Sequence, residues 1–140
     1  EHGDSQVLTW SLATVGGASV REFCDLRGIT LDESVMQDID QRVRFAGRSI
    51  IAGKGATYYG IGSALASIVD VILRDERAIM TVCTPLPEVA GVRDVTVSLP
   101  LLLGGSGVVA SLPVRLDEGE TAALHAGAAA VREAIDSLGL

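Results

Sequence analysis

Aromatic residues and cysteines are both scarce in this chain of 140 residues. Only 4% of its residues are Phe, Trp or Tyr, and its two cysteines, Cys24 and Cys83, lack the close spacing of a metal site or of a redox motif. We therefore expect reduced, buried thiols in a cytoplasmic protein, with a disulfide between the two as the open alternative. No metal site is predicted.

Positive charge is too sparse to serve a nucleic acid or an anionic membrane surface. The chain has 11 basic and 18 acidic residues, for a formal net charge of -7, whereas both partners require basic patches that neutralise phosphate. Uninterrupted apolar runs are also short, since none approaches the roughly 18 residues of a membrane-spanning helix. With 48% hydrophobic residues, the composition predicts one soluble globular domain over residues 1–140, with no nucleic-acid or membrane partner.

The chain begins without an initiator methionine, a signal peptide or a positively charged leader. It opens directly on the polar sequence Glu1-His2-Gly3-Asp4-Ser5, and we expect it to be a piece of a longer protein. No internal repeat, low-complexity linker or charge block divides the rest of the sequence, which agrees with one compact unit.

Apolar residues at helical spacing predict two consecutive helices in the first half of the chain. Thr30-Leu31-Asp32-Glu33 has the pattern of a capping box, so a helix should begin there, and the glycines at 53 and 55 should end it. Helical spacing resumes from residue 58 to residue 72, with Thr57 as the expected N-cap. The two helices should follow each other almost at once.

The second half of the chain changes to patterns typical of strands. Residues 78–83 and 95–99 favour strands, and the glycines at 104–107 separate two apolar runs as a hairpin turn would, so three antiparallel strands are predicted there. An earlier strand is predicted over residues 7–15. Asp117 to Glu120 is typical of an N-cap followed by an acidic first turn, and an apolar stripe predicts a final helix to the C-terminus. These elements indicate an α+β fold, with antiparallel strands packed against long helices.

Two local patterns suggest chemistry without establishing it. His2 has an ordinary pKa of about 6.5, suited to proton transfer near neutral pH, although a histidine in so polar a setting is more often a solvated loop residue. The glycine-rich stretch at 53–62 matches neither a P-loop nor a dinucleotide fingerprint, and by pattern alone it is a break between helices. At such a break the hydroxyl of Thr57 can either cap the helix or face a ligand.

Two segments considered together resemble a known family. Glu1-His2-Gly3-Asp4-Ser5, continuing to Trp10-Ser11, and Lys54-Gly55-Ala56-Thr57-Tyr58-Tyr59-Gly60-Ile61-Gly62 are similar, in this order and at this separation, to the C-terminal catalytic domain of NAD-dependent L-lactate dehydrogenases in the lactate/malate dehydrogenase family. The resemblance covers essentially the whole chain. It implies that residues 1–140 are the substrate and catalytic domain, beginning at the loop of the catalytic histidine.

The resemblance also implies roles for five residues. His2 corresponds to the acid/base that protonates the keto oxygen of pyruvate and accepts the hydroxyl proton of L-lactate. Thr57 corresponds to a threonine beside substrate and nicotinamide, Ile61 to an apolar residue against the nicotinamide ring, and Ala46 and Gly47 to positions that line the subsite for the substrate side chain. Core packing is the alternative for Ile61, Ala46 and Gly47.

The family's Rossmann half, its substrate-binding arginines and the aspartate partner of its histidine have no counterpart in this sequence, so we expect this chain alone to be inactive. For the complete protein the resemblance implies NAD as cofactor, pyruvate and L-lactate as substrates in glycolysis, a homotetramer and a cytoplasmic location. Arg48-Ser49 departs from the Tyr-Glu of many bacterial lactate enzymes, which leaves another L-2-hydroxy acid open as substrate. Malate dehydrogenase is a further alternative within the same class. A non-enzymatic α+β oligomerisation domain is the alternative from a different class.

Overall fold

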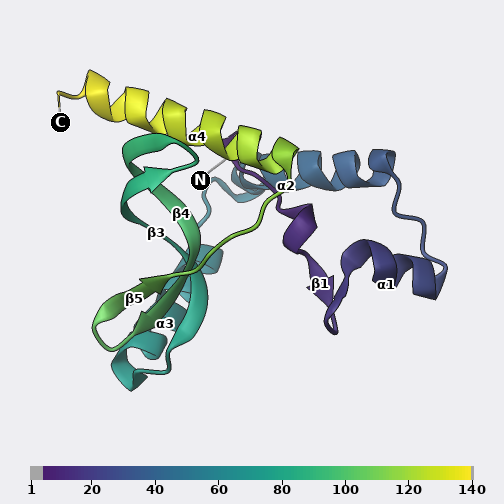
Figure 1. The fold of residues 1–140 in the computed structure, drawn as a ribbon, viewed down its shortest axis with the longest axis horizontal. Helices are drawn as coiled ribbons and strands as arrows, with labels where there is room; N and C mark the ends of the chain where they lie inside the picture. The colour runs from purple at the N-terminus through teal and green to yellow at the C-terminus, as the bar shows by residue number, and fades with distance from the viewer. Residues whose placement is uncertain (1–4, 140) are drawn as a thin grey trace.

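The computed structural model describes residues 5–139 and has the expected α+β architecture (Figure 1). The prediction for His2 therefore lies outside the described residues. A short 3-10 helix at Trp10–Leu12 comes first. It is followed by β1 (Thr14–Val15), β2 (Ala18–Ser19), α1 (Val20–Arg27), α2 (Glu33–Lys54), α3 (Tyr59–Arg74), β3 (Ala78–Val89), β4 (Val92–Gly104), β5 (Gly107–Ser111) and α4 (Glu118–Ser137).

The predicted antiparallel strands are confirmed as one sheet with the order β3-β4-β5. Val82 lies opposite Leu99 in the β3–β4 pair, and Leu101 lies opposite Ser111 in the β4–β5 pair. The predicted glycine turn joins β4 to β5, and Gly107 has the positive φ of 90° that such a turn requires. β4 is thus the central strand, the one with neighbours on both sides.

Two helices cover different parts of this sheet and create two hydrophobic clusters. α4 packs on the first part of β4, where Val95 and Val97 contact its Ala128. α3 packs on the last part of β4, where Leu101 contacts Val71. In Figure 1 α4 crosses one end of the sheet and α3 lies behind the other. Val95 and Leu101 are fully buried, and burying one such side chain stabilises the fold by about 1.5–3 kcal/mol.

The long helices end as predicted, but two of their N-caps differ from the prediction. α2 begins two residues later than expected, because Asp32 rather than Thr30 is its N-cap and accepts a hydrogen bond from the backbone N–H of Val35 at 3.0 Å. This bond, followed by that from the Ser34 hydroxyl, lowers the pKa of Asp32. Gly55 ends α2 with a φ of 84°. α3 begins after Tyr58, so the prediction of Thr57 as N-cap is wrong.

The prediction of a strand over residues 7–15 is wrong for most of its length. Only Thr14 and Val15 pair, in a two-residue hairpin with Ala18 and Ser19, and the preceding residues turn into the 3-10 helix. Side-chain bonds of Trp10 and of Ser11 to distant helices replace a β-ladder here. The sequence patterns also missed α1, which is capped by Ser19 through a 3.2 Å bond from the N–H of Glu22.

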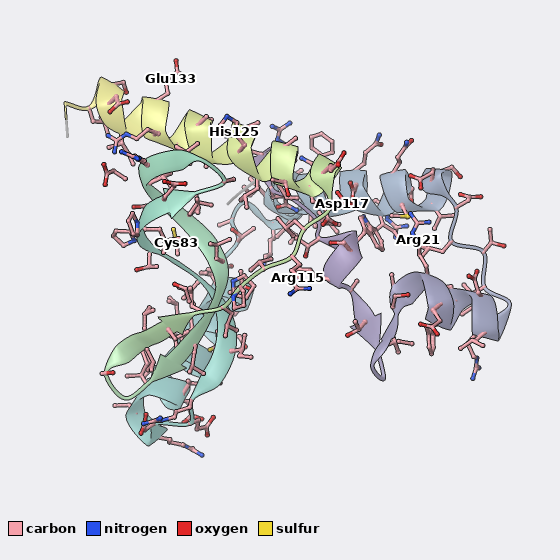
Figure 2. All side chains as sticks on the ribbon, in the orientation of Figure 1. Arg21, Cys83, Arg115, Asp117, His125 and Glu133 are labelled. Carbon is pink, nitrogen blue, oxygen red and sulfur yellow. The ribbon has the colours of Figure 1, made fainter. Side chains whose placement is uncertain are left out.

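The two cysteines differ in their surroundings. Both are free thiols; Cys24 on α1 is buried as expected, but Cys83 on β3 is exposed, which corrects the prediction for it (Figure 2). Cys83 is exposed because the side chains of β3 alternate between the two faces of the sheet. Across residues 5–139, no helix has both the length and the apolarity needed to cross a membrane.

Candidate functional site

The break between α2 and α3 holds two of the site residues implied by the resemblance. Gly55 ends α2 in a left-handed conformation, and the chain then turns through Thr57 into α3. Thr57 is exposed in this turn, and Ile61, one helical turn further on, is 56% exposed. No side chain caps α3, so the hydroxyl of Thr57 is not engaged in the capping bond expected of it. The break therefore presents a hydroxyl next to an apolar side chain on one open surface.

Cation–π and ring contacts connect the end of α2 to the start of α3 across this break. The Nζ atom of Lys54, the last residue of α2, lies 4.8 Å from the ring centroid of Tyr58 and 4.8 Å from that of Tyr59. The two rings lie 4.6 Å apart. Cation–π contacts at exposed sites stabilise by about 0.5–1 kcal/mol each. Because these residues flank Thr57, the contacts fix the path of the chain on both sides of its hydroxyl.

Ala46 and Gly47 occupy the same helix, α2, upstream of the break. Both are exposed, and a Cβ atom added to Gly47 would meet nothing within 4 Å. Ala46 also lines an open hollow of about 520 Å³, together with Phe45 and Ile50. Ile61, Ala46 and Gly47 are thus all exposed in this chain, and none of them belongs to its two hydrophobic clusters.

A more enclosed cavity lies elsewhere, beside the segment that follows His2 in the sequence. It measures about 330 Å³ and is lined by Ser5 to Thr9, by Val43 of α2, by residues 97–100 of β4 and by Leu124 of α4. Of the implied site residues that the structure describes, none lines it. Thr57 and Ile61 thus lie at the α2–α3 break and Ala46 and Gly47 on α2, and no described cavity contains both pairs.

Two acidic residues that the sequence patterns did not single out fix the segment after His2. The indole N–H of Trp10 donates to Asp40 of α2 at 3.0 Å, and the backbone N–H of Ser11 donates to Glu120 of α4 at 2.9 Å. Trp10 itself is half-buried. The indole N–H of a half-buried Trp requires a hydrogen-bond acceptor. The presence of Trp10 was therefore the one indication in the sequence of an acceptor such as Asp40.

The second histidine stabilises a turn rather than a site. His125 on α4 is exposed (Figure 2), and its Nδ1 lies 2.8 Å from the backbone oxygen of Ala90 in the β3–β4 turn. Arg132, further along α4, donates to the backbone oxygen of Asp94 at 2.6 Å. Ala90 in the turn and Asp94 in β4 both have a positive φ, so these two bonds support strained residues at the turn and just after it.

Comparisons with known proteins agree with this fold and these motifs. The family profile described as the lactate/malate dehydrogenase alpha/beta C-terminal domain matches residues 1–138. L-lactate dehydrogenase of Geotalea daltonii is 53% identical over 138 residues, which are 99% of this chain and 44% of that protein. L-lactate dehydrogenase of Thermus aquaticus is 48% identical over 139 residues, which are 99% of this chain and 45% of that protein.

Solved structures show the same relationship. Minor L-lactate dehydrogenase from Enterococcus mundtii superposes with a TM-score of 0.90 at 32% identity, over 98% of this chain and 43% of that one. Malate dehydrogenase from Salinibacter ruber superposes with a TM-score of 0.86 at 29% identity, over 99% of this chain and 43% of that one. The chain thus spans less than half the length of the proteins that it matches. Its full-length match to the family profile shows that it belongs to the lactate/malate dehydrogenase family, as the alpha/beta C-terminal domain.

Proposed function

We propose that this chain is the substrate half of an NAD-dependent L-lactate dehydrogenase, which interconverts pyruvate and L-lactate. The main support is the 53% identity, over 99% of the chain, to a relative named L-lactate dehydrogenase. Malate dehydrogenase is the second candidate, because a structure of that name superposes almost as well. Arg48 and Ser49, which depart from the lactate pattern, leave another L-2-hydroxy acid open as substrate.

His2 is proposed as the acid/base. Reduction of the keto group places negative charge on its oxygen, and a protonated imidazole both stabilises that charge and donates the proton. In the reverse direction the neutral imidazole accepts the hydroxyl proton. The sequence around His2, together with the second motif at Lys54 to Gly62, supports this assignment.

The surface at the α2–α3 break fits a nicotinamide ring, and the proposed role of NAD is to supply or accept the hydride. Ile61 offers an exposed apolar side chain to a ring face, and Thr57 offers a hydroxyl to a polar group of substrate or cofactor. Gly60 and Gly62 leave open space beside them, because a Cβ at either position would meet nothing within 4 Å. Ala46 and Gly47 are proposed to leave room for the small side chain of the substrate.

The test joins this chain to a dinucleotide-binding half. In the Geotalea daltonii relative the matched C-terminal segment is replaced by this chain, and the product is called the hybrid enzyme. We expect it to oxidise NADH with pyruvate, with a kcat/KM for pyruvate well above that for oxaloacetate. The variant His2→Asn should lower kcat by at least about 100-fold, the range of general acid–base catalysis, and leave the Kd for NADH unchanged.

The outcomes separate the alternatives. A hybrid enzyme that prefers oxaloacetate would favour malate dehydrogenase. A hybrid enzyme that binds NADH but reduces neither substrate would contradict the dehydrogenase proposal and favour the oligomerisation domain. For the complete enzyme we also propose a homotetramer in the cytoplasm, which sedimentation and cell fractionation would test.

A further inference from the structure

Residues 6–9, which lie between His2 and Trp10 in the sequence, have little structure of their own to fix their position. Residues 6–9 are in neither a helix nor a strand, and residues 5–9 line the 330 Å³ cavity instead of filling it. A segment of this kind is positioned mainly by its ends. Its described end is the pair Trp10 and Ser11, which is therefore the point where the rest of the chain determines its position.

Glu120 fixes this pair through Ser11. It is only 8% exposed, and it is the one charged residue that is buried among residues 5–139. Its carboxylate accepts from the backbone N–H of Ser11 at 2.9 Å, from the hydroxyl of Ser11, and from the backbone N–H of Asp117 at 3.2 Å. Only the bond from Asp117 belongs to the capping box of α4. The two bonds from Ser11 add nothing to the start of the helix and tie it to the segment after His2.

Asp40 fixes the same pair through Trp10. Its Oδ1 accepts the indole N–H at 3.0 Å, across the gap between the 3-10 helix and α2. Met36 is the only residue of α2 that is buried, so hydrophobic packing within this chain fixes α2 poorly. The Trp10–Asp40 bond thus connects the segment after His2 to the helix that carries Ala46 and Gly47 and leads to Thr57.

We propose that Asp40 and Glu120 are positioning residues of the reaction, which set the segment bearing His2 relative to α2 through Trp10 and Ser11. This inference rests on the proposed function. Neither carboxylate touches the substrate. Their role is to keep the imidazole and the substrate-binding helix in one relative position, which matters because a displacement of about 1 Å in an active site can cost about 100-fold in rate.

The hybrid enzyme provides the test, with four variants and two matched controls. Asp40→Ala and Glu120→Ala remove the acceptors. Trp10→Phe and Ser11→Ala remove the donor side chains and leave both helices unchanged. The control for Asp40 is Asp38→Ala, on the same helix, where the carboxylate is exposed and bonds only to Arg42 among the contacts described. The control for Glu120 is Glu118→Ala, also an acid in the first turn of α4 but exposed.

We expect Asp40→Ala and Glu120→Ala each to lower kcat by about 10-fold or more while the Kd for NADH stays within about twofold. The midpoint of the pH profile of kcat/KM, which reports the acid/base group of the free enzyme, should shift in both. Trp10→Phe should lower kcat similarly and add little in the Asp40→Ala background, because residues that act through one bond are not additive. Asp40→Asn retains an acceptor and should restore kcat. Both controls should have a kcat near that of the unaltered hybrid enzyme.

Three results would overturn the proposal. The first is an unchanged kcat in the four variants. The second is a loss of kcat in the controls as large as in the variants. The third is a loss of kcat together with weaker NADH binding and an unchanged midpoint of the pH profile. If Asp40→Ala and Glu120→Ala do not assemble, Trp10→Phe and Ser11→Ala test the proposal by the same criteria. An unaltered hybrid enzyme that fails to reduce pyruvate would refute the proposed function instead, so the two failures are distinguishable.

Discussion

Replacement of Asp117 by alanine should weaken the start of α4 by a defined amount. Asp117 is the N-cap, and its Oδ1 accepts from the backbone N–H of Glu120 at 2.7 Å (Figure 2). In the reverse direction Glu120 accepts from the backbone N–H of residue 117, which alanine retains. The substitution therefore removes one of the two bonds of the capping box and leaves the other.

The magnitude follows from that count. Loss of an N-cap acceptor costs about 1 kcal/mol, within a range of roughly 0.5–2. Loss of a negative charge at the helix N-terminus adds about 0.3–1 kcal/mol at low ionic strength. The sum, about 1–2 kcal/mol, corresponds to a 5- to 30-fold larger opening constant for the first turn, since about 1.4 kcal/mol is a factor of ten.

Amide hydrogen exchange, followed by mass spectrometry on peptides from the start of α4, measures this opening directly. We expect faster exchange there in the Asp117→Ala hybrid enzyme and unchanged exchange in β3. Asp117→Asn keeps the acceptor and loses only the charge, so its effect should stay below about fivefold. Equal effects of alanine and asparagine would refute the hydrogen-bond account and leave only the charge.

Three further predictions concern the core, the start of α2 and the β3–β4 turn. Leu101→Ala should lower the free energy of unfolding of this domain by about 2–5 kcal/mol, because the side chain is fully buried; a denaturant midpoint equal to that of the parent would contradict it. The pKa of Asp32 is lowered mainly by the N–H of Val35, so its stabilisation of α2 should be present above the ordinary aspartate pKa of about 3.9 and lost as the pH falls through the lower folded value. Asp32→Asn should abolish this acid dependence of exchange at the start of α2, and its persistence would exclude Asp32 as the source. Arg132→Met removes the donor to the backbone oxygen of Asp94 and should speed exchange in residues 90–94 by about 10-fold, with no change expected in β5.

The elements predicted correctly are those whose signals are local in the sequence. α4 has its cap and its capping glutamate within one turn, and Ala128 of its predicted stripe is buried against β4. The hairpin between β4 and β5 has its glycines at the turn itself. Likewise, Gly55 ends α2 where the sequence placed the end, because a positive φ favours glycine.

The error over residues 7–15 comes from contact between distant parts of the chain. Residues 7–15 have strand-like composition, but the partner of Trp10 is 30 positions away and that of Ser11 is 109 positions away. No local pattern shows such bonds. α1 was missed because it is only eight residues long and buries a single residue, Cys24, so it is shorter than the stretch over which helical periodicity becomes clear.

The same distinction applies to the candidate site. The break that presents Thr57 was evident from its glycines, and Ile61 from its place one turn later. Asp40 and Glu120 could not be found in this way, because one lies among the charged residues of α2 and the other belongs to a helix cap. Only the folded chain brings them to the segment that follows His2.

The position of Asp40 along α2 has a mechanical consequence. From Asp40 to Gly55 the helix extends for about 22 Å, at about 1.5 Å per residue. A tilt of about 5° about the Asp40 end would therefore move the Gly55 end by about 2 Å, enough to change the clearance beside Thr57. Substitutions near Asp40 could thus alter the choice of substrate from a distance, with every residue at the α2–α3 break unchanged.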